Sequence, residues 1–299
     1  MPNSPLNFAL LNALPLAKRL VRQPNANKSH SGKVLLIGGS IGMAGALILS
    51  ARATLYSGAG WTLLSMLDGY SAHALEKQAE LMIQNGSEVD PISELQRIQA
   101  QVIAIGPGLG KSELARRWLG AVLKYQANAL HLSAIVLDAD ALNLIAENPD
   151  LLTVLQTSKV PCILTPHPGE AARLLRTSSA VIQEDREASM TQLVSLCHHI
   201  VVLKGQHTLL ASPNQTGLVC AEGNAGLAVG GTGDVLTGLI ASLAAQGIAH
   251  QLNPWEAACL GVQVHALAAD RLLKKNRGSI GMTPSELILE IRQTLNDLL

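Results

Sequence analysis

The sequence predicts an α/β protein of three layers, in which a mostly parallel central sheet carries helices on both faces. Six short runs of Val, Ile and Leu are continuous rather than alternating, which is typical of strands buried on both faces. Several of these runs are followed by Gly, Asp or Pro and then by a helical pattern. No low-complexity linker or internal repeat divides the 299 residues. We therefore expect one domain over residues 1–299, with residues 1–28 as an N-terminal helical extension.

The expected elements follow in chain order. An apolar run at residues 6–17 predicts an amphipathic opening helix. The expected strands cover residues 34–37, 61–66, 102–105, 134–137, 162–165 and 200–203. The expected helices include residues 113–125, 169–175, 185–198, 234–246 and 254–276.

The uncharged stretch at residues 34–51 is long enough to consider as a membrane helix. Its four glycines predict instead a strand, a tight turn and the start of a helix. The loop 38–46 in this stretch does not meet the G-x-G-x-x-G pattern of dinucleotide-binding proteins, so alone it indicates only a turn.

The charge balance excludes whole classes of partner. The chain has 22 basic and 22 acidic residues, so no net field attracts nucleic acid or an anionic membrane. Its three Trp, three Tyr and one Phe are too few for the stacking platforms of single-strand nucleic-acid binders. We therefore expect a small-molecule site, with no nucleic acid and no membrane partner.

The cysteines and the opening segment predict a cytoplasmic protein. The four cysteines form no C-x-x-C pair and no zinc spacing, which fits a reducing compartment. Residues 6–17 lack a preceding positive charge and contain Asn7, Asn12 and Pro15, unlike the apolar core of a signal peptide.

The strongest chemical signal is the segment that ends at Asp234. Gly230, Gly231 and Gly233, with Thr232 among them, precede this aspartate and a helix rich in Ala and Leu. Free backbone N–H groups and the helix dipole would favour a phosphate there. A carboxylate beside that anion site suits a general base or a metal ligand. The alternative is that Asp234 only caps the helix.

A second segment, Lys204, Gly205, Gln206, His207 and Thr208, follows an expected strand. It offers a cation, a small residue and a hydroxyl at a spacing suited to one phosphate chain. A solvated surface lysine at a strand end is the alternative interpretation.

The prolines on both sides of His167 fix its backbone, so its ring is held at a strand end. We interpret it as a positioned residue, with a packed or capping histidine as the alternative. Glu170 would either cap the next helix or support His167. Asp138 and Asp140 could together hold Mg²⁺ if the backbone is extended, whereas on a turn one of them would cap a helix.

Taken together, these segments resemble the ADP- or ATP-dependent NAD(P)H-hydrate dehydratases of the ribokinase-like superfamily. The resemblance runs from Ser29 to about Leu287. The Gly-Gly-x-Gly-Asp ending is specific only to the superfamily, whereas residues 165–170 and 138–143 point to the dehydratase branch. The chain departs from the usual family pattern in having Tyr56 before Ser-Gly-Ala-Gly, Ala79 before Glu80, and Leu227 and Val229 in the late glycine segment.

The resemblance implies a division of the site. Ala46, Gly108 or Gly110, His167 and Asp234 would contact the hydrated nicotinamide nucleotide. The adenine nucleotide would be held by the segment 204–208 and by Gly230, Gly231, Thr232 and Gly233.

The implied reaction is a lyase reaction that repairs (6S)-NADHX and (6S)-NADPHX to NADH and NADPH. Asp234 would deprotonate the C6 hydroxyl, which receives a phosphoryl group, and the ring nitrogen would then expel phosphate. ADP, with Mg²⁺ on its phosphates, is the expected donor and would give AMP, although no motif distinguishes ADP from ATP. The metal ligands of the protein remain unassigned.

The resemblance also implies a homo-oligomer, commonly a homotetramer in the family. No stretch resembles an epimerase domain, so we expect the NAD(P)H-hydrate epimerase to be a separate chain. Two alternatives remain: a ribokinase-like kinase of a vitamin precursor, against which the His167 segment argues, and a non-catalytic adenine-nucleotide sensor, against which Asp234 argues.

Overall fold

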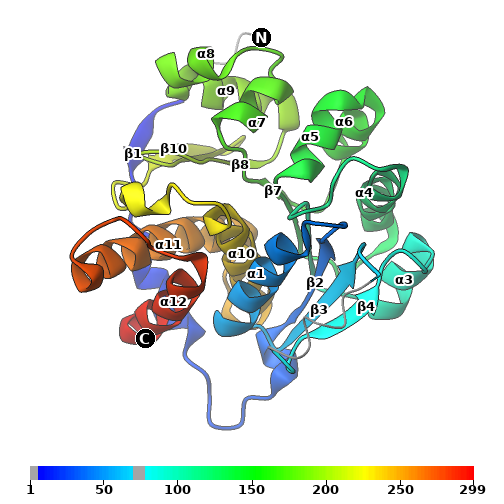
Figure 1. Cartoon of the computed structure of the whole chain (residues 1–299), viewed down its shortest axis with the longest axis horizontal. Coiled ribbons are helices and arrows are strands. Elements are labelled where there is room, and N and C mark those ends of the chain that lie inside the picture. Colours follow the sequence, from blue (N-terminus) through cyan, green and yellow to red (C-terminus); the bar gives the residue numbers. More distant parts are fainter. Residues whose placement is uncertain (1–5, 70–77) are drawn as a thin grey trace.

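The computed structural model describes residues 6–69 and 78–299 (Figure 1). Its strands are β1 (Phe8–Leu10), β2 (Lys33–Gly38), β3 (Trp61–Met66), β4 (Met82–Asn85), β5 (Val102–Ile105), β6 (Ala134–Leu137), β7 (Cys162–Leu164), β8 (Ile200–Leu203), β9 (Leu209–Ser212) and β10 (Gln215–Val219). These strands form one sheet in the order β1-β10-β9-β8-β7-β6-β5-β2-β3-β4. Only β9 runs antiparallel to its neighbours β8 and β10, and the other pairs are parallel. The predicted α/β class with a mostly parallel sheet is confirmed.

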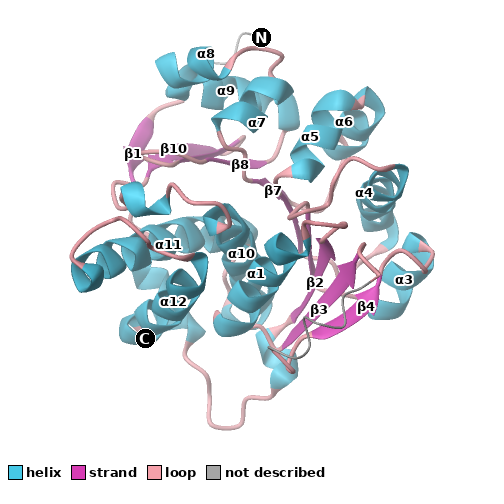
Figure 2. Cartoon of the chain, in the orientation of Figure 1, coloured by secondary structure: helices cyan, strands magenta, loops and turns pink. Residues whose placement is uncertain are grey.

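Helices cover both faces of this sheet (Figure 2). The α-helices are α1 (Ala44–Tyr56), α3 (Pro91–Ile98), α4 (Glu113–Tyr125), α5 (Asp140–Glu147), α6 (Pro149–Gln156), α7 (Pro168–Leu174), α8 (Ser179–Glu184), α9 (Arg186–Cys197), α10 (Thr232–His250), α11 (Pro254–Asn276) and α12 (Pro284–Leu298). Short 3₁₀ helices are η1 (Leu14–Leu20), η2 (Lys28–Ser31), η3 (Gln126–Asn128) and η4 (Ala225–Leu227). None of the described helices is both long and apolar enough to cross a membrane.

The two helical layers bury alternate residues of the same strands. In β2, Val34 and Leu36 join the core under α1, α10, α11 and α12. Leu35 and Ile37 join the core under the opposite layer, which contains α3 to α9. Because both faces are covered, neither set can be polar, and the strand becomes a continuous apolar run. This is the physical reason that these strands could be predicted.

The central elements match the prediction closely, and the edges do not. Strands β3, β5, β6 and β8 and helices α4 and α11 have the predicted bounds. The stretch 34–51 is strand, turn and helix start as predicted. The strands β1, β4, β9 and β10 were not predicted. Strands β1, β4 and β10 are half-exposed, and β9 is buried but ends in Ala211 and Ser212 rather than continuing as a run of Val, Ile and Leu.

The prediction of an amphipathic helix over residues 6–17 was wrong. Residues 8–10 are strand β1, which pairs in parallel with β10. The amides of Ala13 and Leu14 both donate to Gln263 Oε1, at 2.6 and 3.2 Å. Pro15, which has no amide hydrogen, lies in the first turn of η1. The backbone before Pro15 thus finds its partners on the sheet edge and on α11 rather than within a helix.

Close packing between α1 and α10 fixes the start of α10. A Cβ on Gly238 would lie 2.0 Å from Ser50 O, so only glycine permits this approach. Ser50 Oγ donates to Asp234 O at 2.6 Å, and Thr54 Oγ1 donates to Gly238 O at 3.0 Å. The first turn of α10 is therefore anchored to α1.

Candidate active site

A buried ion pair lies at the carboxyl ends of β6 and β8. Lys204 Nζ donates to Asp138 Oδ1 at 2.7 Å. Thr237 Oγ1, one turn after Asp234 on α10, donates to Asp138 Oδ2 at 2.7 Å. Burial alone would raise the pKa of Asp138, but the Lys204 charge, together with the hydrogen bonds from Lys204, Thr237 and Thr165, holds the pKa below its usual range. The pKa of Lys204 is raised, since Asp138 and Glu170 outweigh its own burial.

The idea that Asp138 and Asp140 act together on a metal is wrong. Both oxygens of Asp138 are used by Lys204 and Thr237. Asp140 begins α5 and turns to another partner, with its Oδ2 accepting from Gly110 N at 2.9 Å. Within residues 6–69 and 78–299, no group of three or more His, Cys, Asp and Glu side chains could hold a metal ion.

Asp234 is the third residue of α10, and it does not cap the helix. The N-cap is Gly231, at φ +99°, which has no side chain to accept a hydrogen bond from the first turn of the helix. In the described part of the chain, no group donates a hydrogen bond to the Asp234 carboxylate. Burial, and next the charge of Asp138, raise its pKa from 3.8 to about 7. A partly buried carboxyl with a pKa near neutrality suits a general base.

The start of α10 presents unused backbone donors. Among the described residues, no protein acceptor faces the N–H groups of residues 231–234. Thr232 Oγ1 donates to Leu227 O and Val229 O, at 2.9 and 3.1 Å. His265 Nε2 lies 3.0 Å from Thr232 O, and burial lowers the pKa of His265 to about 4, so this neutral ring donates to the carbonyl. These bonds hold the donors in place for an anion at the positive end of the helix dipole.

A cavity of about 540 Å³ opens beside these donors. Its lining includes the sequence-predicted residues Lys204, Gly205, Gln206, His207, Thr208, Thr232 and Gly233. Gly230 and Gly231 lie outside the lining. On its rim, Asp270 accepts from Gly223 N at 3.0 Å and from Asn224 Nδ2 at 2.8 Å. Two segments that were predicted separately, 204–208 and 232–233, therefore form the wall of one pocket.

His167 caps α7. Its Nδ1 accepts from the amides of Gly169 and Glu170, at 2.9 and 3.3 Å, and Glu170 Oε2 accepts from His167 N at 2.8 Å. Burial, and next the Lys204 charge, lower the pKa of His167. The neutral ring therefore carries its proton on Nε2, which lies 3.2 Å from Glu170 Oε1. The capping interpretation is confirmed, and half of the side chain still remains exposed for a ligand.

Glu170 fulfils both roles considered for it, since it caps α7 reciprocally and supports the His167 ring. It is 4% exposed, and its Oε2 lies 3.9 Å from Lys204 Nζ. Burial raises the pKa of Glu170 to about 7, although the Lys204 charge acts in the opposite direction.

The two glycine loops after β2 and β5 lie against each other. Gly39 N donates to Pro107 O at 3.0 Å, and Ser40 N donates to Gly108 O at 2.6 Å. Gly108 has φ +60°, and a Cβ there would lie 2.4 Å from Met43 O, so the close approach requires glycine. This contact brings Gly108 and Gly110 to the loop that leads into Ala46, in the first turn of α1. A role for these residues in substrate binding stays a prediction.

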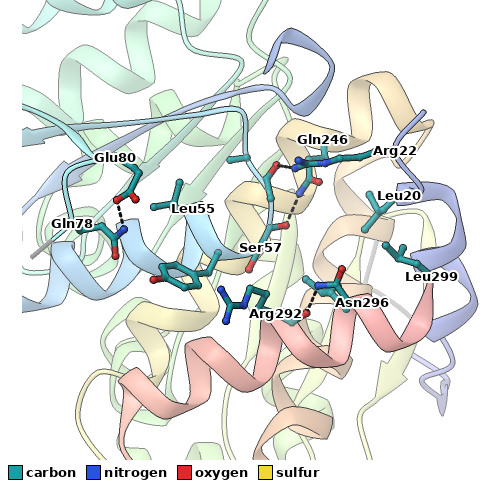
Figure 3. A pocket seen from close by; sticks show the side chains of 14 residues that line it. Leu20, Arg22, Leu55, Ser57, Gln78, Glu80, Gln246, Arg292, Asn296 and Leu299 are labelled. Atoms are coloured by element: carbon teal, nitrogen blue, oxygen red, sulfur yellow. Dashed lines mark hydrogen bonds between the residues drawn. The ribbon is translucent and has the colours of Figure 1, made fainter. Parts of the chain in front are cut away.

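A second cavity, of about 680 Å³, lies at the other end of α1 (Figure 3). Tyr56, one of the departures from the family pattern, lines it together with Glu80, and the Arg292 guanidinium lies 5.1 Å from the Tyr56 ring centre. Ala46 and Tyr56 are ten residues apart on α1, or roughly 15 Å. Tyr56 and the cavity that it lines therefore lie away from the glycine loops.

Two residues of the site were not found from the sequence, and the partner of a third was missed. Thr237 and His265 are uncharged partners on helices, and the role of Asp138 as the partner of Lys204 joins positions 66 residues apart. Only Thr237 had a signal, since it lies one helical turn after Asp234.

The mostly parallel sheet between two helical layers, with unused N–H groups at the start of α10, is the architecture of a ribokinase-like protein, and a ribokinase-like superfamily protein from Enterococcus faecalis superposes with a TM-score of 0.82 at 26% identity, covering 97% of this chain and 96% of the other. Residues 34–293 match the family model described as NAD(P)H-hydrate dehydratase. The chain belongs to this family.

Relatives and solved structures agree with this assignment. The chain is 37% identical over 269 residues to the ADP-dependent (S)-NAD(P)H-hydrate dehydratase of Neisseria meningitidis, covering 89% of the chain and 86% of the relative. It is 38% identical over 275 residues to the bifunctional NAD(P)H-hydrate repair enzyme of Coxiella burnetii, covering 92% of the chain but 52% of the relative. The chain thus spans about half the length of several relatives.

Among solved structures, a hypothetical protein from Streptococcus mutans superposes with a TM-score of 0.82 at 27% identity, covering 97% of this chain and 99% of the other. The ADP/ATP-dependent NAD(P)H-hydrate dehydratase of Bacillus subtilis, co-crystallised with ATP/Mg²⁺, superposes with a TM-score of 0.82 at 24% identity. The match covers 98% of this chain and 99% of the other. At that identity, the second comparison shows the shared fold.

Proposed function

We propose that the protein dehydrates the hydrated nicotinamide nucleotides (6S)-NADHX and (6S)-NADPHX to NADH and NADPH, using ADP as phosphoryl donor. The single observation that carries the proposal is Asp234, a carboxyl with no hydrogen-bond donor among the described residues and a pKa of about 7, at a helix start with free N–H groups. Membership of the NAD(P)H-hydrate dehydratase family supports the choice of substrate.

In the proposed reaction, Asp234 takes the proton of the C6 hydroxyl. The hydroxyl oxygen of the substrate attacks the β-phosphoryl group of ADP, and AMP leaves. The N–H groups of Gly231, Thr232 and Gly233 stabilise the negative charge on the transferred group. The ring nitrogen of the substrate then expels phosphate. The cavity wall formed by Lys204 to Thr208 and by Gly233 would hold the adenine nucleotide. Ala46, Gly108, Gly110 and His167 would hold the hydrated nucleotide.

Mg²⁺ fits this site as an ion that comes with the nucleotide. Its preferred ligands are oxygens, and it keeps several waters and binds phosphates through one or two carboxylates. The described residues offer no three-ligand cage, while Asp234 offers one carboxylate beside the proposed phosphate site. Magnesium would supply charge neutralisation on the phosphate oxygens.

The choice of ADP over ATP is supported by the name of the Neisseria relative. We also propose a cytoplasmic location, because the four cysteines are free and buried. We further propose a homo-oligomer, a homotetramer as the resemblance implies, and cooperation with an NAD(P)H-hydrate epimerase. The bifunctional names of several relatives support the link to a second repair activity.

The test is an assay with purified protein, (6S)-NADHX, Mg²⁺ and either ADP or ATP. We expect NADH absorbance to appear with ADP, with one AMP released per NADH, and no NADH when the nucleotide is omitted. A vitamin-precursor kinase would leave NADHX unchanged, and an adenine-nucleotide sensor would bind ADP without forming AMP. Either result would overturn the proposal.

A further inference from the structure

The proposed reaction needs a second proton acceptor, and this inference rests on the proposed function. Removing water from NADHX breaks the C6–O bond and also a C5–H bond, because the product has a C5=C6 double bond. Asp234 becomes protonated when it takes the hydroxyl proton. With Asp234 assigned to the C6 hydroxyl and the transferred phosphoryl group, an acceptor on the side of C5 is still required.

Most acidic and basic groups of the site are already committed. Asp138 is 1% exposed and both of its oxygens accept hydrogen bonds. Glu170 is 4% exposed and is tied to His167 N. His167 uses Nδ1 to accept two backbone amides, and its Nε2 faces the Glu170 carboxylate.

Asp140 is a further carboxylate beside the glycine loops. It is partly exposed, and its Oδ2 accepts from Gly110 N at 2.9 Å. Asn143 Nδ2 donates to its Oδ1 at 3.3 Å, and Asn143 is held in turn by Arg173 at 3.0 Å. These bonds fix the orientation of the carboxylate but use only two of its roughly four acceptor positions.

Asp140 also lies near the reacting end of the site. Its charge is among the causes that raise the pKa of Asp234. Asp140 is therefore bonded to Gly110, on the proposed substrate side, and its charge also acts on the proposed base on α10.

We propose that Asp140 is the base that removes the C5 proton after phosphate has left. When the C6–O bond breaks, its electron pair goes to phosphate, which takes the proton held by Asp234 and leaves as HPO₄²⁻, and the lone pair of N1 forms an N1=C6 iminium. Asp140 then takes the C5 proton. The C5–H electron pair forms the C5=C6 bond, and N1 regains its lone pair. No oxidant or reductant is needed.

The experiment measures AMP, phosphate and NADH together for the wild type and for Asp140→Asn, which keeps the shape and an oxygen acceptor for Gly110 N. In the wild type we expect one AMP per NADH. In D140N, we expect NADH formation to fall on the order of 10²- to 10⁴-fold, the range for a positioned base. AMP should form in excess, because the trapped iminium regains water at C6 and is phosphorylated again.

Substrate deuterated at C5 provides a second measurement. The isotope effect on NADH formation should be larger in D140N than in the wild type, since C5–H cleavage becomes slower than the earlier steps. Asp140→Glu, which restores a carboxylate, should bring the AMP to NADH ratio back toward one.

The matched control is Ser40→Ala, which loosens the same glycine loop by removing the 2.6 Å bond from Ser40 Oγ to Leu109 O. A purely structural role for Asp140 would make D140N resemble S40A, with AMP and NADH falling in equal proportion and an unchanged isotope effect. That result would overturn the assignment of Asp140. Failure of the wild type to form AMP and NADH would instead overturn the proposed function.

Discussion

Lys204 Nζ lies 2.7 Å from Asp138 Oδ1, and this pair stands between the two proposed halves of the site. On one side, Lys204 is 3.9 Å from Glu170, which holds the cap made by His167. On the other side, a Cβ on Gly233 would lie 3.3 Å from the same Nζ. One buried cation therefore acts on both the nucleotide side and the nicotinamide side.

Replacement of this cation should first affect folding. Lys204→Met leaves the Asp138 carboxylate buried without its partner, which typically costs about 3–5 kcal/mol. We expect the free energy of unfolding in urea to fall by that amount at pH 7. The double variant Lys204→Met with Asp138→Asn removes both charges and should recover most of the loss. An unchanged stability of the single variant would contradict the ion-pair account.

The strands could be predicted from the sequence, whereas the pairing of Lys204 with Asp138 could not. Strands such as β5 and β6 were predictable because burial on both faces leaves a continuous apolar run. The partners of Lys204 were not, because nothing local connects it with Asp138, 66 residues away. The helix predicted over residues 6–17 was wrong for a similar reason, since the partners of this segment, β10 and Gln263, are more than 200 residues away in the sequence.

The unused N–H groups at the glycine-rich start of α10 could be predicted because the glycines and the helix are adjacent in sequence. The cavity could not, since its walls come from 204–208, 221–228 and α11. The capping role of His167 was an open alternative, because a ring nitrogen can accept from the backbone only in the geometry that the fold supplies.

Asp234→Asn should abolish the base while leaving nucleotide binding intact. We expect turnover to fall on the order of 10²- to 10⁴-fold, with ADP affinity in calorimetry close to that of the wild type. The wild-type kcat should rise through about pH 7 to a plateau, because the carboxylate form of Asp234 is required and its pKa lies there. Activity above one tenth of wild type in the variant would exclude Asp234 as the base.

The same substitution should stabilise the protein at high pH. The pKa of Asp234 is raised from 3.8 to about 7 on folding, so its favourable contribution is complete below pH 3.8 and is lost as pH rises through about 7. At pH 8, Asp234→Asn should therefore be more stable than the wild type, on the order of 2–4 kcal/mol at about 1.4 kcal/mol per pKa unit. At pH 3.5 the difference should nearly vanish.

The control for this effect is Asp90→Asn. Hydrogen bonds from the backbone and side chain of Ser93 lower the pKa of Asp90, so its contribution has the opposite dependence on pH. This variant should be less stable than the wild type at pH 8 and should approach it in acid. The same sign for both variants would show that the shift assigned to Asp234 is wrong.

Two substitutions at His167 separate its cap from its proposed ligand contact. His167→Ala should lower stability by about 1 kcal/mol, the usual cost of a lost N-cap, and also raise the KM for NADHX. His167→Asn keeps a capping side chain and should preserve the melting temperature, but it should raise the KM for NADHX as much as alanine does. The KM for ADP should change little in both variants. A normal KM for NADHX in His167→Asn would leave His167 with the cap as its only role.

The central claim is that the C6 hydroxyl oxygen itself becomes phosphorylated at the start of α10. NADHX labelled with ¹⁸O at C6 tests it in a single turnover with ADP, followed by mass spectrometry of the released phosphate. The account predicts one ¹⁸O in each phosphate, one phosphate per NADH, and the loss of both products in Asp234→Asn. Unlabelled phosphate, with the ¹⁸O found in water, would contradict it.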